Sequence, residues 1–237
     1  MRAHSYPIDR LMTRATRLAA PLAAALLAAC APPPPPPPPP LPALAPFPQG
    51  VAPIAAPTEV WSREAGLLLR GAAPVRVPYL GMRLAVLQTA GDSLQVRCLA
   101  CPGAPIGWTD RLKVIWVAST PEQARGGEIA EFVLAVRQAA LRRDFTALRS
   151  AMSPMFVHGL EGREGLTAAV ADLQGPRAAD LARVPSLLDR GVAPVPGTRV
   201  WAAPPEFATL PGYSDLRTGF VNGENGWEWT FLLRPGR

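Results

Sequence analysis

The 237-residue sequence is poor in the side chains that most often bind metal ions or carry out catalysis. It contains two histidines and three cysteines, and Lys113 is the only lysine among its 24 basic residues. A structural zinc site needs four ligands, which is more than this supply offers in one region. The sequence also lacks a nucleophile elbow, a phosphate-binding loop and a metal-ligand series. We therefore expect a non-catalytic protein without metal or other cofactor, and we assign no catalytic residue.

Positive charge is present but is not concentrated. The formal net charge is +6, and removing the charged residues that precede Cys30 leaves about +3. A nucleic-acid-binding protein would show a basic stripe or a basic cluster with aromatic residues, and neither is present. This excludes nucleic acid as an expected partner.

The N-terminus carries a short apolar run. Arg14 and Arg17 precede an apolar stretch over residues 18–27, which is the order expected of an export signal. The stretch is shorter than the roughly 20 residues that a transmembrane helix needs. Residues 1–29 are therefore predicted to be a signal peptide, with Met1 or Met12 as its start.

The end of this leader, Leu27-Ala28-Ala29-Cys30, resembles the bacterial lipobox. The resemblance implies that Cys30 is lipidated and attaches the mature chain to a membrane, facing the periplasm. The alternative is an ordinary cleaved leader that happens to end near a cysteine. Ala31 is similar to the residue that accompanies outer-membrane sorting, although the choice between inner and outer membrane stays open.

A proline-rich segment follows the lipidation site. Pro32–Pro40 is an unbroken run of proline, which excludes α-helix and favours polyproline II. Nine such residues extend over roughly 28 Å. We interpret residues 30–57 as a lipidated cysteine and a tether without fixed tertiary position. A proline-rich ligand for an aromatic groove is the alternative.

From Trp61 onward the sequence consists of short apolar runs separated by turn residues. The runs at 67–70, 83–87, 94–98, 106–109 and 112–116 predict strands, with Gly and Pro between them. Five short strands in about sixty residues predict a small all-β barrel over residues 58–120.

The same runs, in order and spacing, resemble the bacterial Src-homology-3-like domain over about residues 60–118. The resemblance rests on Leu67–Arg70, Leu80-Gly81, Leu84–Leu87, Leu94–Arg97 and the closing Gly107-Trp108. It implies that Gly107 permits close approach of two strands and that Trp108 fills the mouth of the barrel. Leu94 and Thr109 depart from the family pattern. Such domains bind cell-wall peptides or act as spacers.

Cys98 and Cys101 are the only cysteines after Cys30. An oxidising compartment favours a disulfide between them. Two alternatives stay open, namely a pair of reduced packing residues and a redox or metal site. Redox motifs with this cysteine spacing stand at the start of a helix, whereas here Pro102-Gly103 follows the second cysteine, which argues against a redox role.

After Pro121 the apolar spacing becomes helical. It predicts a helix over 128–143, a second one capped by Asp144 and including Leu148 and Met152, and a third one around 166–173. A fourth helix over 181–188 is expected to be interrupted by Pro185.

The C-terminus predicts a hairpin. Residues 216–220 and 227–233 flank a turn at 222–226. Trp227, Trp229, Phe231 and Leu233 alternate with polar residues and predict one apolar face. Helices followed by a hairpin indicate an α+β domain over residues 121–237. Its opening around Arg142–Leu148 loosely resembles the nuclear-transport-factor-like fold, a resemblance that names no activity.

Three residues are candidate ligand-binding positions: Tyr79, Trp108 and His158. His158 lies among apolar residues, so a packing role competes with a role as a base, and the acidic residues Glu161, Glu164 and Asp172 follow it in the chain. Trp108 is expected to support the barrel before it supports any ligand. Trp201, Tyr213, Trp227 and Trp229 either line a pocket or form core.

Together these features predict a membrane-anchored periplasmic lipoprotein of the cell envelope. It presents a binding or spacer barrel and an α+β domain of unknown function, with peptidoglycan or envelope proteins as partners. The alternative is a periplasmic small-molecule binder or enzyme that uses the C-terminal domain with His158. A third interpretation is a structural accessory of an envelope assembly.

Overall fold

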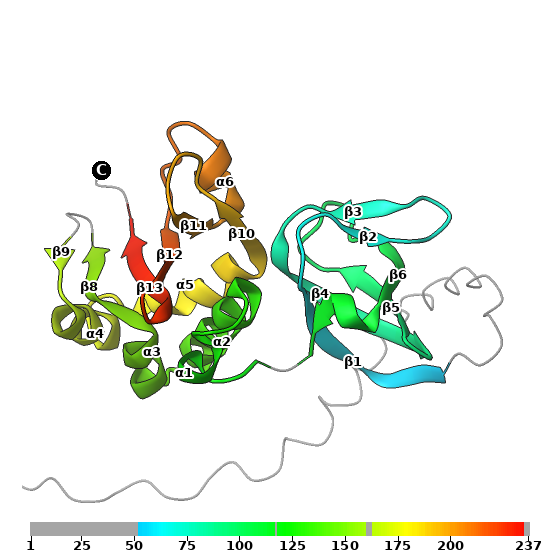
Figure 1. The fold of residues 1–237 in the computed structure, drawn as a ribbon, viewed down its shortest axis with the longest axis horizontal. Coiled ribbons are helices and arrows are strands. Elements are labelled where there is room, and N and C mark those ends of the chain that lie inside the picture. Colours follow the sequence, from blue (N-terminus) through cyan, green and yellow to red (C-terminus); the bar gives the residue numbers. More distant parts are fainter. Residues whose placement is uncertain (1–51, 117, 160–162, 235–237) are drawn as a thin grey trace, which may run out of the picture. The chain divides into compact units, whose positions relative to one another are not determined.

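The computed structural model describes residues 52–116, 118–159 and 163–234. For residues 52–57 and 163–164 it describes the backbone alone. Strands dominate the described residues, and a few helices accompany them (Figure 1). The predicted signal peptide, the lipidation site at Cys30 and the proline run lie outside the described residues. Within these residues, no helix is both long enough and apolar enough to cross a membrane.

The N-terminal half of the described chain is built from antiparallel strands. Two long strands, β1 and β4, pair with each other, and β4 also pairs with β5. The elements of this half are β1 (Ala52–Ser62), β2 (Leu67–Leu69), β3 (Val75–Val77), β4 (Leu80–Ala90), β5 (Ser93–Cys98), β6 (Ile106–Asp110), the 3-10 turn η2 (Arg111–Lys113) and β7 (Val114–Ile115). Strand β1 begins at Ala52, inside the segment that we expected to be tether.

The predicted strand over 112–116 is partly wrong. Residues 111–113 form η2, in which the backbone N–H of Leu112 donates to the side chain of Asp110 at 2.9 Å. Leu112 is 80% exposed and so contributes nothing to a core. An aspartate that caps a turn competes locally with strand formation, which explains why only β7 remains extended.

Gly107 lies where two strands make close contact. A Cβ atom at this position would lie 2.8 Å from the Cβ of Leu69 and 3.1 Å from the carbonyl oxygen of Arg70. The neighbouring Trp108 exchanges two backbone hydrogen bonds with Arg70, at 2.7 and 2.8 Å. A residue without a side chain is therefore needed for β6 to cross the end of β2.

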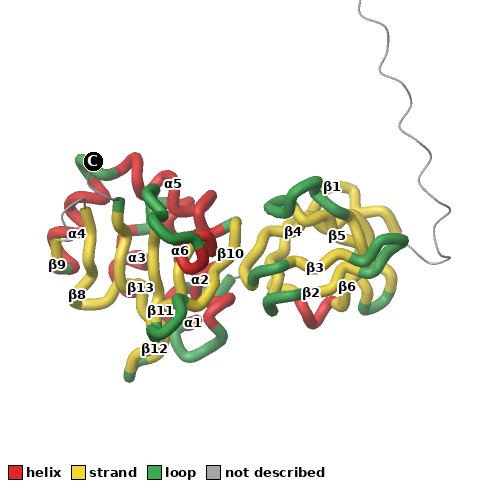
Figure 2. The backbone as a smooth tube through the Cα atoms, turned by 90° about the horizontal axis from the view of Figure 1, so that it is seen from above, coloured by secondary structure: helices red, strands yellow, loops and turns green. Residues whose placement is uncertain are grey.

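The C-terminal half contains helices packed against a sheet (Figure 2). Its elements are α1 (Pro121–Ala124), α2 (Ile129–Arg142), α3 (Phe145–Ala151), β8 (Met152–Gly159), β9 (Arg163–Glu164), α4 (Leu166–Gln174), α5 (Ala178–Leu188), β10 (Arg190–Pro194), β11 (Val200–Ala203), α6 (Pro205–Thr209), β12 (Arg217–Gly223) and β13 (Gly226–Leu233). The helices predicted at 128–143 and 166–173 are confirmed. The second predicted helix is α3, and Met152 already belongs to β8.

The turn between α2 and α3 follows from two adjacent residues. Arg143 adopts a left-handed conformation with φ 54°, and the N–H of Asp144 donates to the carbonyl of Ala139 at 2.9 Å. This is how helices commonly end. Asp144 then accepts a hydrogen bond from the N–H of Ala147 at 3.0 Å and starts α3, as its side chain predicted.

Pro185 does not interrupt α5. The N–H of Asp189 donates to the carbonyl of Pro185 at 2.9 Å, so the helix continues for a turn beyond the proline. Leu181, Val184 and Leu188 are buried in the main core. Packing of this apolar face outweighs the hydrogen bond that proline cannot donate.

The C-terminal hairpin is confirmed, but its predicted apolar face is not. The pairing of β12 with β13 shifts register between Gly219 and Phe220, so Gly219 faces Phe231 and Phe220 faces Trp229. This bulge reverses the alternation after Trp229. Leu232 is therefore fully buried together with Trp229, while the ring of Phe231 crosses over Gly219 on the other face.

Strands from the two halves pair directly. The order of the sheet is β6-β5-β4-β10-β11-β12-β13-β8-β9, in which β10 pairs antiparallel with β4 through Arg190↔Met82 and Val192↔Leu80. Two apolar clusters flank this junction. One lies among β1–β7, and the larger one lies between the helices and the second part of the sheet and includes Trp61 of β1.

Candidate functional site

The three candidate ligand-binding residues lie on separate elements. Tyr79 precedes β4 and is half-buried, Trp108 is half-buried in β6, and His158 is fully buried in β8. None of them lines the pocket beside α1–α3 or the pocket beside Arg70 and Lys113. The structure therefore does not assemble these residues into one site.

His158 is buried and pairs with a partly exposed aspartate. Its Nδ1 lies 3.2 Å from Oδ2 of Asp172, which α4 places beside β8, and its side chain has 0% exposure. Of the other acidic residues near it in the chain, Glu161 lies outside the described residues, and Glu164 pairs through its backbone with Val157. A group in this position contacts no solvent, so it could meet a substrate only after β8 or α4 moved.

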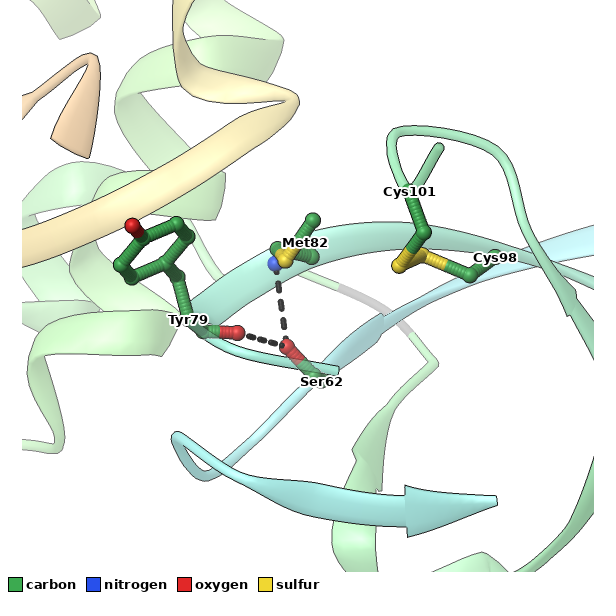
Figure 3. Close-up of a disulfide and its surroundings, with 5 residues drawn as sticks. All are labelled: Ser62, Tyr79, Met82, Cys98 and Cys101. Carbon is green, nitrogen blue, oxygen red and sulfur yellow. Dashed lines mark hydrogen bonds between the residues drawn. A yellow bond between two sulfur atoms is a disulfide. The ribbon is translucent and has the colours of Figure 1, made fainter. Parts of the chain in front are cut away.

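The structure joins Cys98 and Cys101 by a disulfide, with their Cα atoms 5.4 Å apart (Figure 3). The loop is also tied to β4, because the N–H of Leu99 donates to the carbonyl of Arg83 at 3.0 Å. Cys98 is fully buried and Cys101 is 9% exposed. Among the described residues, no group of three potential metal ligands occurs.

Tyr79 is fixed by a buried serine. The hydroxyl of Ser62 donates to the carbonyl of Tyr79 at 2.9 Å and accepts from the N–H of Met82 at 3.0 Å. In Figure 3 the ring of Tyr79 points toward β10 and away from the disulfide. Its Cβ lies 2.8 Å from the position that a Cβ of Gly191 would take. Tyr79 therefore packs at the strand junction.

A pocket of about 260 Å³ lies where the N-terminal strands meet α1–α3, and we call it the seam pocket. Its walls combine two tryptophans with polar and small side chains. They are Glu59, Trp61, Trp116, Ala118, Ser119, Thr120, Pro121, Ala135, Gln138, Ala139, Arg142, Asp144 and Ala147. Sequence reasoning missed this site because its residues come from four separate segments.

Each tryptophan of the seam pocket has an arginine over its ring. The guanidinium of Arg137 lies 5.0 Å from the ring centre of Trp61, and that of Arg111 lies 5.1 Å from the ring centre of Trp116. Neither arginine lines the pocket. Arg137 is held in turn by Asp189, through contacts at 2.5 and 3.2 Å. These cation–π contacts fix both rings before any ligand binds.

The indole N–H groups of Trp61 and Trp116 are buried, and no described residue accepts a hydrogen bond from either of them. Trp61 is only 6% exposed. A buried donor without an acceptor costs about 1–3 kcal/mol. Protein atoms cover both donors, so a ligand in the pocket could reach them only if the rings shifted.

The charged residues of the pocket have different partners. Glu59 forms an ion pair with Arg83, and this hydrogen bond raises the pKa of Arg83 and keeps its guanidinium charged. Asp144 is the cap of α3. Arg142 is exposed, and no ion pair joins it to another described residue. Gln138 adds an amide from the same face of α2.

The remaining aromatic residues are mostly engaged in packing. Trp229 is fully buried, and the indole N–H of Trp227 donates to the carbonyl of Gly127 at 3.1 Å. The hydroxyl of Tyr213 donates to the carbonyl of Leu216 at 3.3 Å, and Trp201 is half-buried beside the main core. The core interpretation therefore holds for Trp229.

One sequence signal could have pointed to the seam pocket. Trp61 and Trp116 open and close the N-terminal segment of strands, and β1 pairs with β7 so that Trp61 faces Ile115. Pairing of the first and last strands brings the two tryptophans together.

No protein-family model matches the chain, and a search of curated proteins found no similar sequence.

Proposed function

We propose that this chain is a non-catalytic lipoprotein of the bacterial envelope whose folded part binds a component of the cell wall. Cys30 carries the lipid, and the proline-rich segment separates the folded part from the membrane. The observation that carries the binding role is the seam pocket, with its two fixed tryptophans and its polar wall residues Gln138, Arg142 and Asp144. A pocket lined by aromatic walls and a few polar groups is typical of ligand sites.

The proposal includes the finer architecture. Residues 58–120 form a barrel of the Src-homology-3-like type, and residues 121–237 form an α+β domain with a loose likeness to the nuclear-transport-factor-like fold, whose strand β10 pairs with β4 of the barrel. The close contact of Gly107 with Leu69 and the bridge between Trp108 and Arg70 support the first assignment. Helices packed on a sheet support the second.

One observation favours the alternative, a periplasmic enzyme or small-molecule binder that uses His158. The imidazole and Asp172 lie in the arrangement by which a carboxylate orients a base. Complete burial of His158 is the counterargument. We therefore place the binding role at the seam pocket and not at His158.

Co-sedimentation with purified cell wall tests the binding role. We expect the full lipidated chain to sediment with insoluble peptidoglycan, and the S119W variant to stay in the supernatant because an indole in this loop fills the pocket. The matched control S119A leaves the pocket open and should sediment like the parent. A parent that remains soluble, or an S119W variant that still sediments, would contradict wall binding at this site.

The lipid anchor has its own test. Cys30→Ser should abolish lipid attachment, because the thiol is the nucleophile that accepts the diacylglyceryl group and a serine hydroxyl is far less nucleophilic. Metabolic labelling of cells with a fatty-acid probe measures this directly. Cys98→Ser serves as the control and should keep its label. Equal labelling of the parent and of Cys30→Ser would show that Cys30 is not the lipidation site.

A further inference from the structure

We propose that the seam pocket binds a single uncharged sugar ring of an envelope glycan. This inference rests on the proposed function and adds the class of ligand. The volume is the first argument. At about 260 Å³ the pocket is smaller than the roughly 300–1,000 Å³ of sites that hold drug-sized ligands. It therefore suits one ring or one amino acid.

Charge balance selects a neutral ligand. The negative charge of Glu59 is matched by Arg83, and the remaining two charged residues of the wall, Arg142 and Asp144, have opposite signs. An anion would find only Arg142, and a cation would compete with the partners that both carboxylates already have. An uncharged ligand binds without leaving a buried charge unpaired.

The polar side chains of the pocket can form hydrogen bonds with adjacent hydroxyl groups of a sugar ring. Carboxylate, amide and guanidinium groups each present two adjacent polar atoms in one plane, and the wall holds all three types in Asp144, Gln138 and Arg142. Adjacent hydroxyls of a sugar ring both donate and accept, so they can pair with any of these groups. A zwitterionic amino acid, in contrast, needs a free carboxylate for its ammonium group.

The tryptophans supply the rest of the recognition. Aromatic rings pack against the apolar C–H face of a sugar, and Trp116, the more exposed of the two tryptophans, is the ring that can do so here. Trp61 and Trp116 are held by Arg137 and Arg111, so little freedom is lost on binding.

Ligand-observed saturation-transfer NMR on the full lipidated chain in detergent tests this inference, with N-acetylglucosamine as the probe. We expect the parent to bind and R142A to bind at least about tenfold more weakly, because a charged hydrogen bond is lost. R149A is the matched control, since Arg149 is an exposed arginine on the neighbouring helix α3 and lies outside the pocket. S119W should abolish binding. Thermal melting of each variant verifies that it is folded.

The outcomes separate the inference from the function on which it rests. Binding by the parent and by R149A, with loss in S119W, supports a sugar site. No binding by the parent, binding unchanged in S119W, or pocket-dependent binding of D-alanine instead of the sugar would overturn it. If the sugar fails while pocket-dependent sedimentation with cell wall persists, the ligand class is wrong and the proposed function stands. If both fail, both are wrong.

Discussion

Gly191→Ala should lower the melting temperature of the chain by about 10 °C. Gly191 lies in β10 with φ +91°, and a Cβ there would lie 2.8 Å from the carbonyl oxygen of Leu80 and from the Cβ of Tyr79. The left-handed backbone costs about 1–2 kcal/mol with a side chain, and forced repacking adds about 1–3 kcal/mol. Each kcal/mol shifts the melting temperature by about 2–4 °C in a domain of this size.

A second glycine provides the control. Gly197 also has a positive φ of +74°, but apart from its own backbone and its two chain neighbours no heavy atom of the described residues lies within 4 Å of the position that its Cβ would take. Gly197→Ala therefore carries only the backbone cost of about 1–2 kcal/mol. Calorimetry of both variants separates the two effects. Equal melting temperatures would show that the junction of β4 and β10 accommodates a Cβ at Gly191 without repacking.

Trp229→Ala should reduce the free energy of unfolding by about 3–5 kcal/mol. Trp229 is fully buried, its ring packs edge-on against Phe156 with the centres 5.0 Å apart, and its indole N–H donates to the hydroxyl of Thr218. Truncation leaves a cavity in the main core that the strands on either side cannot fill. The loss is a large share of the 5–15 kcal/mol that stabilises a typical domain.

Trp227→Ala is the matched control, since it removes the same side chain two residues earlier in β13. Trp227 is half-buried, so the cavity is open to solvent and the loss should be clearly smaller. Denaturation by urea, followed by far-UV circular dichroism, measures both variants. A loss for Trp227→Ala as large as that for Trp229→Ala would mean that burial does not set the cost.

The bulge in the C-terminal hairpin shows where sequence periodicity stops being informative. Alternation correctly predicted that Trp229 faces the core, but it also placed Phe231 there and Leu232 outside. Nothing in the residues 227–233 marks Thr230 as the extra residue of a bulge. The shift is set by the partner strand, where Gly219 leaves room for the ring of Phe231.

The strand junction and most walls of the seam pocket carry no local sequence signal. The close packing of Gly191 becomes evident only when β10 is placed against β4. The role of Arg137 becomes evident only from its contacts with Trp61 and Asp189. Each contact joins residues that are at least fifty positions apart. Local patterns cannot specify such pairs, because many arrangements of the same elements are compatible with them.

The sequence by itself determined the local elements whose signals lie within a few residues. These are the helix α2, the cap at Asp144, the helix α4 and the two strands of the C-terminal hairpin. Helical periodicity and capping act over one or two turns, so they can be read directly. Only the tertiary structure decided that β4 and β10 join, that His158 is buried, and that two distant tryptophans share one pocket. Those outcomes depend on which faces pack together, and packing is decided by the whole chain.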